Sequence, residues 1–128
     1  MTAGLADTSV FIASESGHAL DLDALPDSLA VSSITVGELR VGVLAAADVA
    51  TRDQRLQTLT HVLELDPLPI DQAVAEAWAT LRIRLRDAGA RMHVNDSWIA
   101  ATALAHGLAL VSQDHDHVVV EGLEVIRV

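Results

Sequence analysis

The sequence predicts an α/β fold, a three-layer αβα sandwich around a mainly parallel sheet of four or five strands. Short apolar segments alternate along the chain with longer segments of helical spacing, which is the pattern of βα units. The apolar segments are hydrophobic on both faces, as strands covered by helices on each side are. The chain has 128 residues, 51% of them hydrophobic, so we expect one domain over 1–128 with its own core.

The N-terminal half contains two predicted strands and three predicted helices. "GLADTSVFIAS" predicts a short buried strand that turns into a helix near Asp7 and Thr8. "LAVSSI" predicts a second strand, and "TVGELRVGVLAAA" a helix that follows at once, in which Thr35–Glu38 also fits a capping box. Asp48–Leu63 continues as a charged amphipathic helix, and 15–26, rich in Asp and Gly, predicts a loop or a short helical excursion.

The C-terminal half predicts further strands around two helices. "LELDPLPI" predicts a third strand, interrupted by Pro67 and Pro69. Asp71 is the expected N-cap of a long helix that stops at Gly89, and "NDSWIAATALAH" predicts another that ends at Gly107. "LALVS" and "LEVIRV" predict the last strands.

Composition and missing motifs exclude several classes of protein. No apolar run reaches the roughly 18 residues of a membrane helix, and no signal peptide precedes the first strand, so we expect a soluble cytoplasmic protein. The chain has no cysteine, which excludes disulfides, thiolate metal sites and cysteine nucleophiles. A P-loop, a G-x-G-x-x-G motif and a G-x-S-x-G elbow are all absent, which argues against nucleotide-binding and serine-hydrolase functions.

The net charge of −10, from 18 acidic residues against eight arginines and no lysine, would repel nucleic acid over most of the surface. Any contact with nucleic acid must therefore be local. Three arginines at alternate positions on the long helix, followed by one just after it, can form a limited positive face: Arg82, Arg84, Arg86 and Arg91. The alternative is an ordinary solvated helix surface.

Four acidic residues fall where strands end or the following helices begin, the edge at which open parallel sheets bind ligands. They are Asp7, Glu38, Asp96 and Asp114. Each one taken singly is more simply explained as a helix cap. Four caps at one edge would repel one another, because two carboxylates about 5 Å apart cost a little under 1 kcal/mol in water and several times more when partly buried.

A divalent cation would relieve this repulsion. Oxygen ligands without cysteine point to a hard ion, so we expect Mg²⁺, with Mn²⁺ as a substitute, held partly through waters. Such an ion lowers the pKa of a water molecule and orients it toward a phosphodiester. His115 and His117 suggest zinc binding or acid–base catalysis as an alternative, although no metal-binding histidine spacing accompanies them. Trp78 and Trp98 are interpreted as core residues.

The chain resembles the PIN-domain nucleases, in particular the VapC toxins of bacterial toxin–antitoxin pairs. Four segments carry the resemblance: "ADTSVFIA", "SSITVGELRVG", "NDSWIAATALAHGLALVSQD" and "GLEVIRV". It implies a magnesium-dependent endoribonuclease that cleaves RNA with a metal-activated water. Because the chain has no lysine, RNA contact is then expected from a few arginines, by hypothesis Arg82, Arg84, Arg86 and Arg91. "SQDHDH" departs from the family, in which an aromatic residue is common at the end of this loop.

The resemblance also assigns roles to residues. The acidic pocket is built from the four acids already named, and Asp116 is a further metal ligand. Polar neighbours orient these ligands: Thr8, Ser9, Asn95 and Ser112. The expected partners are a second copy of the chain and a small antitoxin whose arginine enters the acidic pocket. Two other functions stay open, a catalytically silent binding module with an acidic pocket and a DNA-directed nuclease of the same fold.

Overall fold

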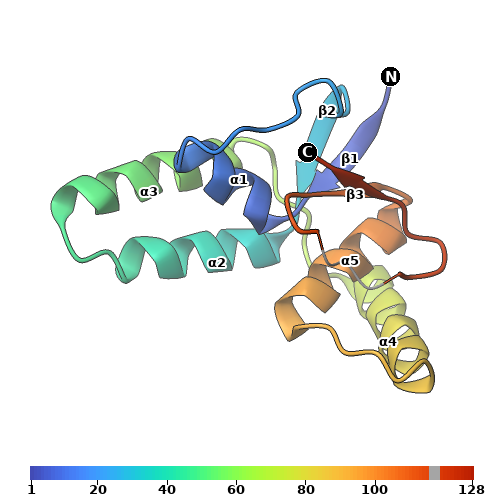
Figure 1. Cartoon of the computed structure of the whole chain (residues 1–128). Coiled ribbons are helices and arrows are strands. Elements are labelled where there is room, and N and C mark those ends of the chain that lie inside the picture. The colour runs from blue at the N-terminus through green and yellow to red at the C-terminus, as the bar shows by residue number, and fades with distance from the viewer. Residues whose placement is uncertain (116–118) are drawn as a thin grey trace.

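The computed structural model describes residues 1–115 and 119–128. The predicted metal ligand Asp116 and the neighbouring His117 lie outside the described residues. In the described part the chain forms five helices and four strands (Figure 1), in the order β1 (Ala3–Ala6), α1 (Thr8–Glu15), β2 (Ser28–Val31), α2 (Ser33–Leu44), α3 (Val49–Leu63), α4 (Gln72–Asp87), α5 (Val94–His106), β3 (Ala109–Ser112) and β4 (Val125–Arg127).

The four strands form one sheet in the order β2-β1-β3-β4, and every pair is parallel. The predicted α/β fold is therefore confirmed. Leu5 in β1 is paired with Ala30 on one side and Leu110 on the other. β1 and β3 approach closely at Gly4, where an added Cβ would lie 2.7 Å from Cγ2 of Val111, so a side chain would push the strands apart.

Successive residues of the strands point to opposite faces of the sheet, and each face has its own helical layer. Ala6, Val31 and Val111 pack with buried residues of α1, α2 and α3. On the other face Leu5 and Leu110 pack against α5. α4 lies outside α5, and Figure 1 shows α2 and α3 side by side, extending away from the sheet. These layers make the three-layer sandwich.

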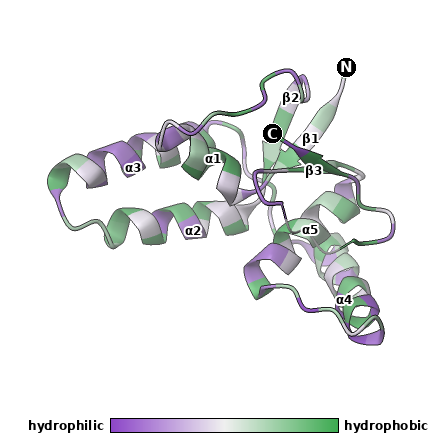
Figure 2. Ribbon diagram, in the orientation of Figure 1, coloured by the Kyte–Doolittle hydropathy of each residue, from purple (hydrophilic) through white to green (hydrophobic). Residues whose placement is uncertain are grey.

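Several helix boundaries agree with the sequence. Asp7 is the N-cap of α1, and Asp71 is the N-cap of α4, where its side chain accepts the backbone N–H of Val74 at 3.0 Å. Gly107 ends α5 in the left-handed region at φ 64°, which glycine adopts without strain. Figure 2 shows hydrophobic and hydrophilic residues alternating along α3 and α4, as expected for helices with one solvated face.

The predicted capping box at Thr35–Glu38 is wrong. α2 begins earlier, because Ser32 is the N-cap and its hydroxyl accepts the backbone N–H of Ile34 at 3.1 Å. Glu38 is therefore more than one turn into the helix, where it cannot cap. Asp96 likewise does not cap α5, because His93 occupies that position and Asp96 lies in the first turn.

The predicted third strand at 63–70 is also wrong. α3 continues to Leu63, and the segment after it forms one isolated parallel bridge between Ser32 and Leu68. Leu68 donates its N–H to Val31 at 2.8 Å. Pro67 and Pro69 on either side of it have no N–H to donate, so the ladder cannot extend.

The segment from 16 to 27, which joins α1 to β2, contains turns and no helix. The loop expected at 15–26 is thus confirmed, apart from its first residue, which ends α1. Among the helices that the structure describes, none is long and apolar enough to cross a membrane.

Candidate functional site

Asp7 lies at the centre of the sheet edge where β1 ends and α1 begins. The residue is 6% exposed. Its backbone N–H donates to the carbonyl of Val111 in β3 at 2.9 Å, which ties the end of β1 to the neighbouring strand. Its Oδ1 accepts the backbone N–H of Ser9 at 2.9 Å and the Ser9 hydroxyl as well. The carboxylate is therefore held in one orientation by the first turn of α1.

Glu38 reaches the same edge from α2 and is held by Thr8. The buried Thr8 hydroxyl donates to Oε1 of Glu38 at 2.8 Å and lies 2.9 Å from the hydroxyl of Thr35. Thr35 is fully buried. Since Thr8 follows Asp7 directly, these hydrogen bonds hold Glu38 beside the start of α1, where Asp7 is the N-cap.

Asp114 is positioned from β3 through a set of hydroxyl groups. Its N–H donates to Oγ of Ser112 at 3.0 Å, and Ser112 is fully buried at the end of the strand. Oγ of Ser9 lies 3.4 Å from that of Ser112 and accepts the N–H of Gln113 at 3.0 Å. Ser9 thus contacts Asp7 on one side and the loop that carries Asp114 on the other.

Asp96 joins the group from the first turn of α5. Although it is exposed as a residue, the pKa of its carboxyl is raised above the ordinary value, first because partial burial removes water from it and second because Asp7 repels its charge. Glu38 and Asp114 act in the same direction, and His93 opposes them. Four acids from four segments of the chain therefore share one electrostatic environment.

These acids fit a hard divalent ion by their chemistry, because they offer carboxylate oxygens and no sulfur. Within the residues that the structure describes, no three histidine or acidic side chains are close enough to hold an ion directly. The arrangement therefore suits an ion that keeps several of its waters, which is the usual behaviour of Mg²⁺. Asp7 and Asp96 also line one small pocket of about 10 Å³.

The structure brings three of the four predicted RNA-contacting arginines together. Arg82 and Arg86 from α4 and Arg91 from the following connection line one hollow. Arg84 does not reach it, since its guanidinium lies 3.4 Å from the carbonyl of Glu121. Asn95 is half-buried at the start of α5, and its backbone N–H donates to Nδ1 of His93 at 3.3 Å.

Sequence reasoning missed several residues around the acids. Thr35 and Gln113 take part in the hydrogen bonds described above, but nothing in their spacing distinguishes them from other polar residues. Trp78 and Trp98 are not core residues, because both are half-buried and stack on each other with their centroids 4.3 Å apart. The indole N–H of Trp78 donates to Oγ of Ser97 at 3.0 Å, next to Asp96.

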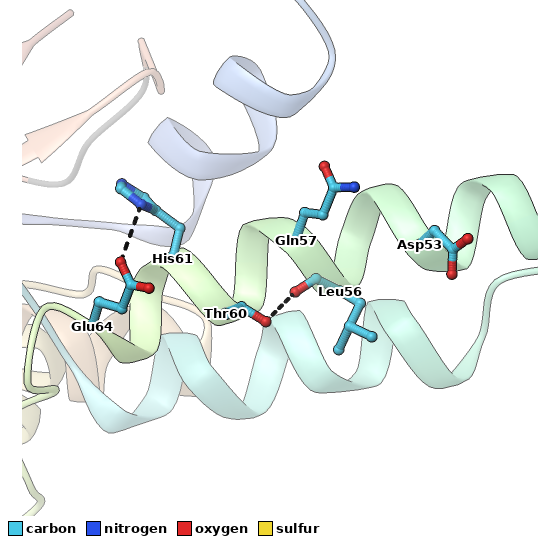
Figure 3. A pocket seen from close by; sticks show the side chains of 6 residues that line it. All are labelled: Asp53, Leu56, Gln57, Thr60, His61 and Glu64. Atoms are coloured by element: carbon cyan, nitrogen blue, oxygen red, sulfur yellow. Dashed lines mark hydrogen bonds and ion pairs between the residues drawn. The ribbon is translucent and has the colours of Figure 1, made fainter.

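A separate hollow of about 440 Å³ lies along α3 (Figure 3). All the side chains that line it belong to the stretch from Asp53 to Glu64. His61 and Glu64 form an exposed contact of 4.0 Å, and the Thr60 hydroxyl donates to the carbonyl of Leu56 at 2.9 Å. It contains none of the predicted site residues and is the exposed face of one helix.

The sequence profile of the PIN domain matches residues 5–123. Ribonuclease VapC5 of Mycobacterium tuberculosis is 49% identical over 129 residues, covering 98% of this chain and 96% of the relative. Ribonuclease VapC4 of the same bacterium is 48% identical over 129 residues, covering 97% and 95%. The chain also matches a crystal structure of VapBC-5, a member of the VapBC family of toxin-antitoxin systems from that bacterium, with a TM-score of 0.91, 44% identity and 100% coverage of both chains. The chain therefore belongs to the PIN-domain family, and within it to the VapC ribonucleases of toxin–antitoxin systems.

Proposed function

We propose that this protein is a Mg²⁺-dependent endoribonuclease whose cleavage of RNA makes it the toxin of its pair. The observation that carries the proposal is the gathering of acids at one edge of the sheet: Asp7 and Asp96 line one pocket, Thr8 beside Asp7 donates to Glu38, and Ser9 joins Asp7 to the loop that carries Asp114. Anionic side chains from remote parts of the chain gather at one edge, and a hard cation would make this gathering favourable. The similarity to ribonucleases VapC5 and VapC4 supports the same function.

Asp7, Asp96 and Asp114 are the proposed residues that hold the first Mg²⁺, partly through its waters, and Mn²⁺ can substitute for it. Glu38 acts through a water or at a second ion, and Asp116 remains a proposed further ligand. When bound, the metal supplies the positive charge that lowers the pKa of the attacking water and stabilises the leaving oxygen. Thr8, Ser9, Asn95 and Ser112 are the proposed orienting residues, because carboxylates that bind metals depend on the hydrogen bonds that hold them.

In the proposed reaction the oxygen of a water attacks phosphorus, and the bond from phosphorus to the 3′-oxygen breaks. Glu38 accepts the proton of this water at the oxygen that the Thr8 hydroxyl does not occupy. The leaving 3′-oxygen takes a proton from solvent water, so the products carry a 5′-phosphate and a 3′-hydroxyl. Attack by the 2′-hydroxyl of the RNA would leave a cyclic phosphate instead, so mapping the ends of the products separates the two reactions.

The test compares Asp7→Asn with Asp53→Asn, an exposed acid on α3 away from the site. Total RNA is incubated with each purified variant in Mg²⁺, and the 5′ ends of the fragments are sequenced. Asp7→Asn should lower the cleavage rate by more than about 100-fold, since even residues that only orient a metal ligand cost 10- to 100-fold. Asp53→Asn and the wild type should cleave alike, and EDTA should silence both. An active Asp7→Asn variant would contradict the proposal.

The same acidic pocket is the proposed docking point of an antitoxin. The similar VapBC-5 structure is described as a toxin–antitoxin system, and an arginine can form paired hydrogen bonds with a carboxylate. We expect an arginine of the antitoxin to enter the pocket and compete with the metal. Replacing that arginine by alanine in the antitoxin should restore RNA cleavage in the mixture, while replacing an arginine elsewhere in the antitoxin should not.

We further propose that residues 1–128 form one domain and that two copies pair. The match of the PIN profile over residues 5–123 supports the first point. Exposed apolar side chains such as Val41, Leu44 and Val49 on the α2–α3 hairpin support the second. Analytical ultracentrifugation of the chain alone distinguishes a monomer from a dimer.

A further inference from the structure

Three arginines surround one hollow of about 280 Å³ at the far end of α4 and in the connection to α5. We call this hollow, lined by Arg82, Arg86 and Arg91 together with Leu85, Ala90 and Met92, the arginine pocket. No acidic residue lines it. In a chain with eight arginines and a net charge of −10, it is therefore a local concentration of positive charge.

The guanidinium groups at the pocket are available to a ligand. The contact of Arg86 with the adjacent Asp87, at 3.1 Å, joins two side chains that are 70% and 65% exposed, so water screens it and a phosphate can compete with it. Arg91 is exposed, and it has no salt bridge among the residues that the structure describes.

Arg82 is held in place by the tryptophan pair. Its guanidinium carbon lies 5.5 Å from the centroid of the Trp78 ring, a cation–π distance. The Trp78 ring stacks on Trp98 with an angle of 3° between the planes, and its N–H donates to Ser97. Arg82 thus rests on a surface that is continuous with the first turns of α5, which carry Asp96.

The arginine pocket also borders the acidic edge directly. Met92 lines it on one side and, on the other, lines the small pocket that contains Asp7 and Asp96. In Figure 1 the connection from α4 to α5 leads from the end of α4 back to the start of α5. A ligand that extends over Met92 would therefore contact arginines on one side and the acids on the other.

The geometry points to a role for this pocket: it binds a backbone phosphate of the RNA strand next to the phosphodiester that is cut. This inference rests on the proposed ribonuclease function. An RNA strand presents phosphates in succession, so one can lie at the metal site while its neighbour lies among the arginines. Guanidinium groups pair well with phosphate oxygens, and the apolar lining from Leu85, Ala90 and Met92 leaves the arginines as the polar groups of the pocket.

The first test measures binding of a fluorescein-labelled, single-stranded RNA pool of mixed sequence by anisotropy in Ca²⁺, with the RNA checked on a gel for cleavage. Arg82→Gln and Arg91→Gln should each weaken binding about tenfold. Each should also reduce the slope of log Kd against log salt by about 0.7, the value for one contact with a single-stranded phosphate. Arg91→Gln is decisive if Arg82→Gln lowers the melting temperature, because the Arg91 side chain has no salt bridge among the residues that the structure describes.

Two control variants distinguish RNA binding at the arginine pocket from attraction by the general positive charge of the arginines. Arg84→Gln removes the same charge from the same helix but outside the pocket, and Arg52→Gln removes it from α3. Both should bind the RNA within about twofold of the wild type, since exposed charges at a distance are screened. Equal losses for all four variants, or no loss for any of them, would overturn the assignment.

The second test uses a defined RNA that the wild type cleaves, with single methylphosphonate groups placed on either side of the cut. If a neutral group at one position weakens wild-type binding but not that of Arg91→Gln, the two perturbations are coupled and the contact is direct. If no methylphosphonate position is coupled to Arg91→Gln, the proposed phosphate contact is overturned. In that case wild-type cleavage still supports the proposed ribonuclease function. If the wild type neither cleaves nor binds RNA, the proposed function and the phosphate contact are both contradicted. Lost affinity for the antitoxin with unchanged affinity for RNA would assign the pocket to the protein partner instead.

Discussion

At the scale of single residues, the Asp96 carboxyl is repelled by the other acids of the edge, first by Asp7. Its pKa is raised above the ordinary value, so protonation stabilises the fold at low pH, and this stability is lost as the pH rises through the raised pKa. The carboxyl group is only partly buried, so solvent screening keeps the effect below about 1 kcal/mol.

Asp96→Asn should therefore melt at a slightly higher temperature than the wild type at neutral pH, because the amide removes the repulsion from Asp7. The difference should vanish below the ordinary aspartate pKa of 3.8, where both proteins are neutral at this position. Thermal unfolding followed by circular dichroism over a pH series measures it. The variant should also fail to cleave RNA, and a variant that is less stable at neutral pH would contradict the electrostatic account.

Ser9 links Asp7 to the loop after β3 through its hydroxyl group. Its hydroxyl donates to Asp7 and accepts the N–H of Gln113, so Ser9→Ala leaves both groups without this partner. We expect a loss of about 1–3 kcal/mol in the free energy of unfolding together with slower RNA cleavage. Urea unfolding measures the first, and Ser14→Ala, an exposed serine of the same helix, is the control and should stay within about 0.5 kcal/mol. Equal stability of the two variants would rule out this role.

At the scale of elements, the caps decide where helices begin. Asp48 caps α3, with Oδ1 accepting the N–H of Thr51 at 2.8 Å and Oδ2 its hydroxyl at 3.1 Å. The backbone hydrogen bond from Thr51 is the main cause of the lowered pKa of Asp48. A lowered pKa contributes stability above the ordinary value of 3.8, and this contribution is lost as the pH falls through the lowered pKa.

Asp48→Ala should destabilise the protein modestly at neutral pH and remove this part of its acid sensitivity, whereas Asp48→Asn should keep most of the cap without its dependence on pH. Helicity and melting temperature over an acid series provide the measurement. An alanine variant that melts like the wild type at neutral pH would show that α3 does not depend on this cap.

At the scale of the whole molecule, the net charge of −10 and the acidic edge together predict a response to divalent ions. An ion that binds the folded state alone stabilises it by mass action, by about 2.7 kcal/mol at 100 times its Kd. Mg²⁺ should therefore raise the melting temperature of the wild type and of Asp53→Asn, but much less that of Asp7→Asn. Equal increases in all three proteins would indicate general screening of charge rather than a site.

The sequence alone predicts much of this molecule, for reasons that differ between residues. Short apolar segments that alternate with helical segments predict the parallel sheet. Asp71 and Gly107 mark the start and the end of a helix, because capping depends on residues close in sequence. The same local reasoning fails at Thr35–Glu38, where Ser32 competes successfully as a cap. It also fails at Leu68, since the flanking prolines permit one bridge but no strand.

The candidate site divides in the same way. The order of strands and helices can be predicted from the sequence. It places four acids at one edge of the sheet: Asp7, Glu38, Asp96 and Asp114. The hydrogen bonds around these acids cannot be predicted in this way, because the contacts of Thr8 with Glu38 and of Ser9 with Gln113 join residues far apart in sequence.

The sequence by itself determined the class of fold and the edge where the acids collect, because hydrophobic periodicity and local capping depend on near neighbours. Only the tertiary structure decided which polar side chains hold those acids and which arginines share a pocket. Alternate arginines on α4 look equivalent in sequence, yet Arg84 reaches Glu121 while Arg82 and Arg86 line the pocket. The direction of a side chain is set by packing against segments remote along the chain.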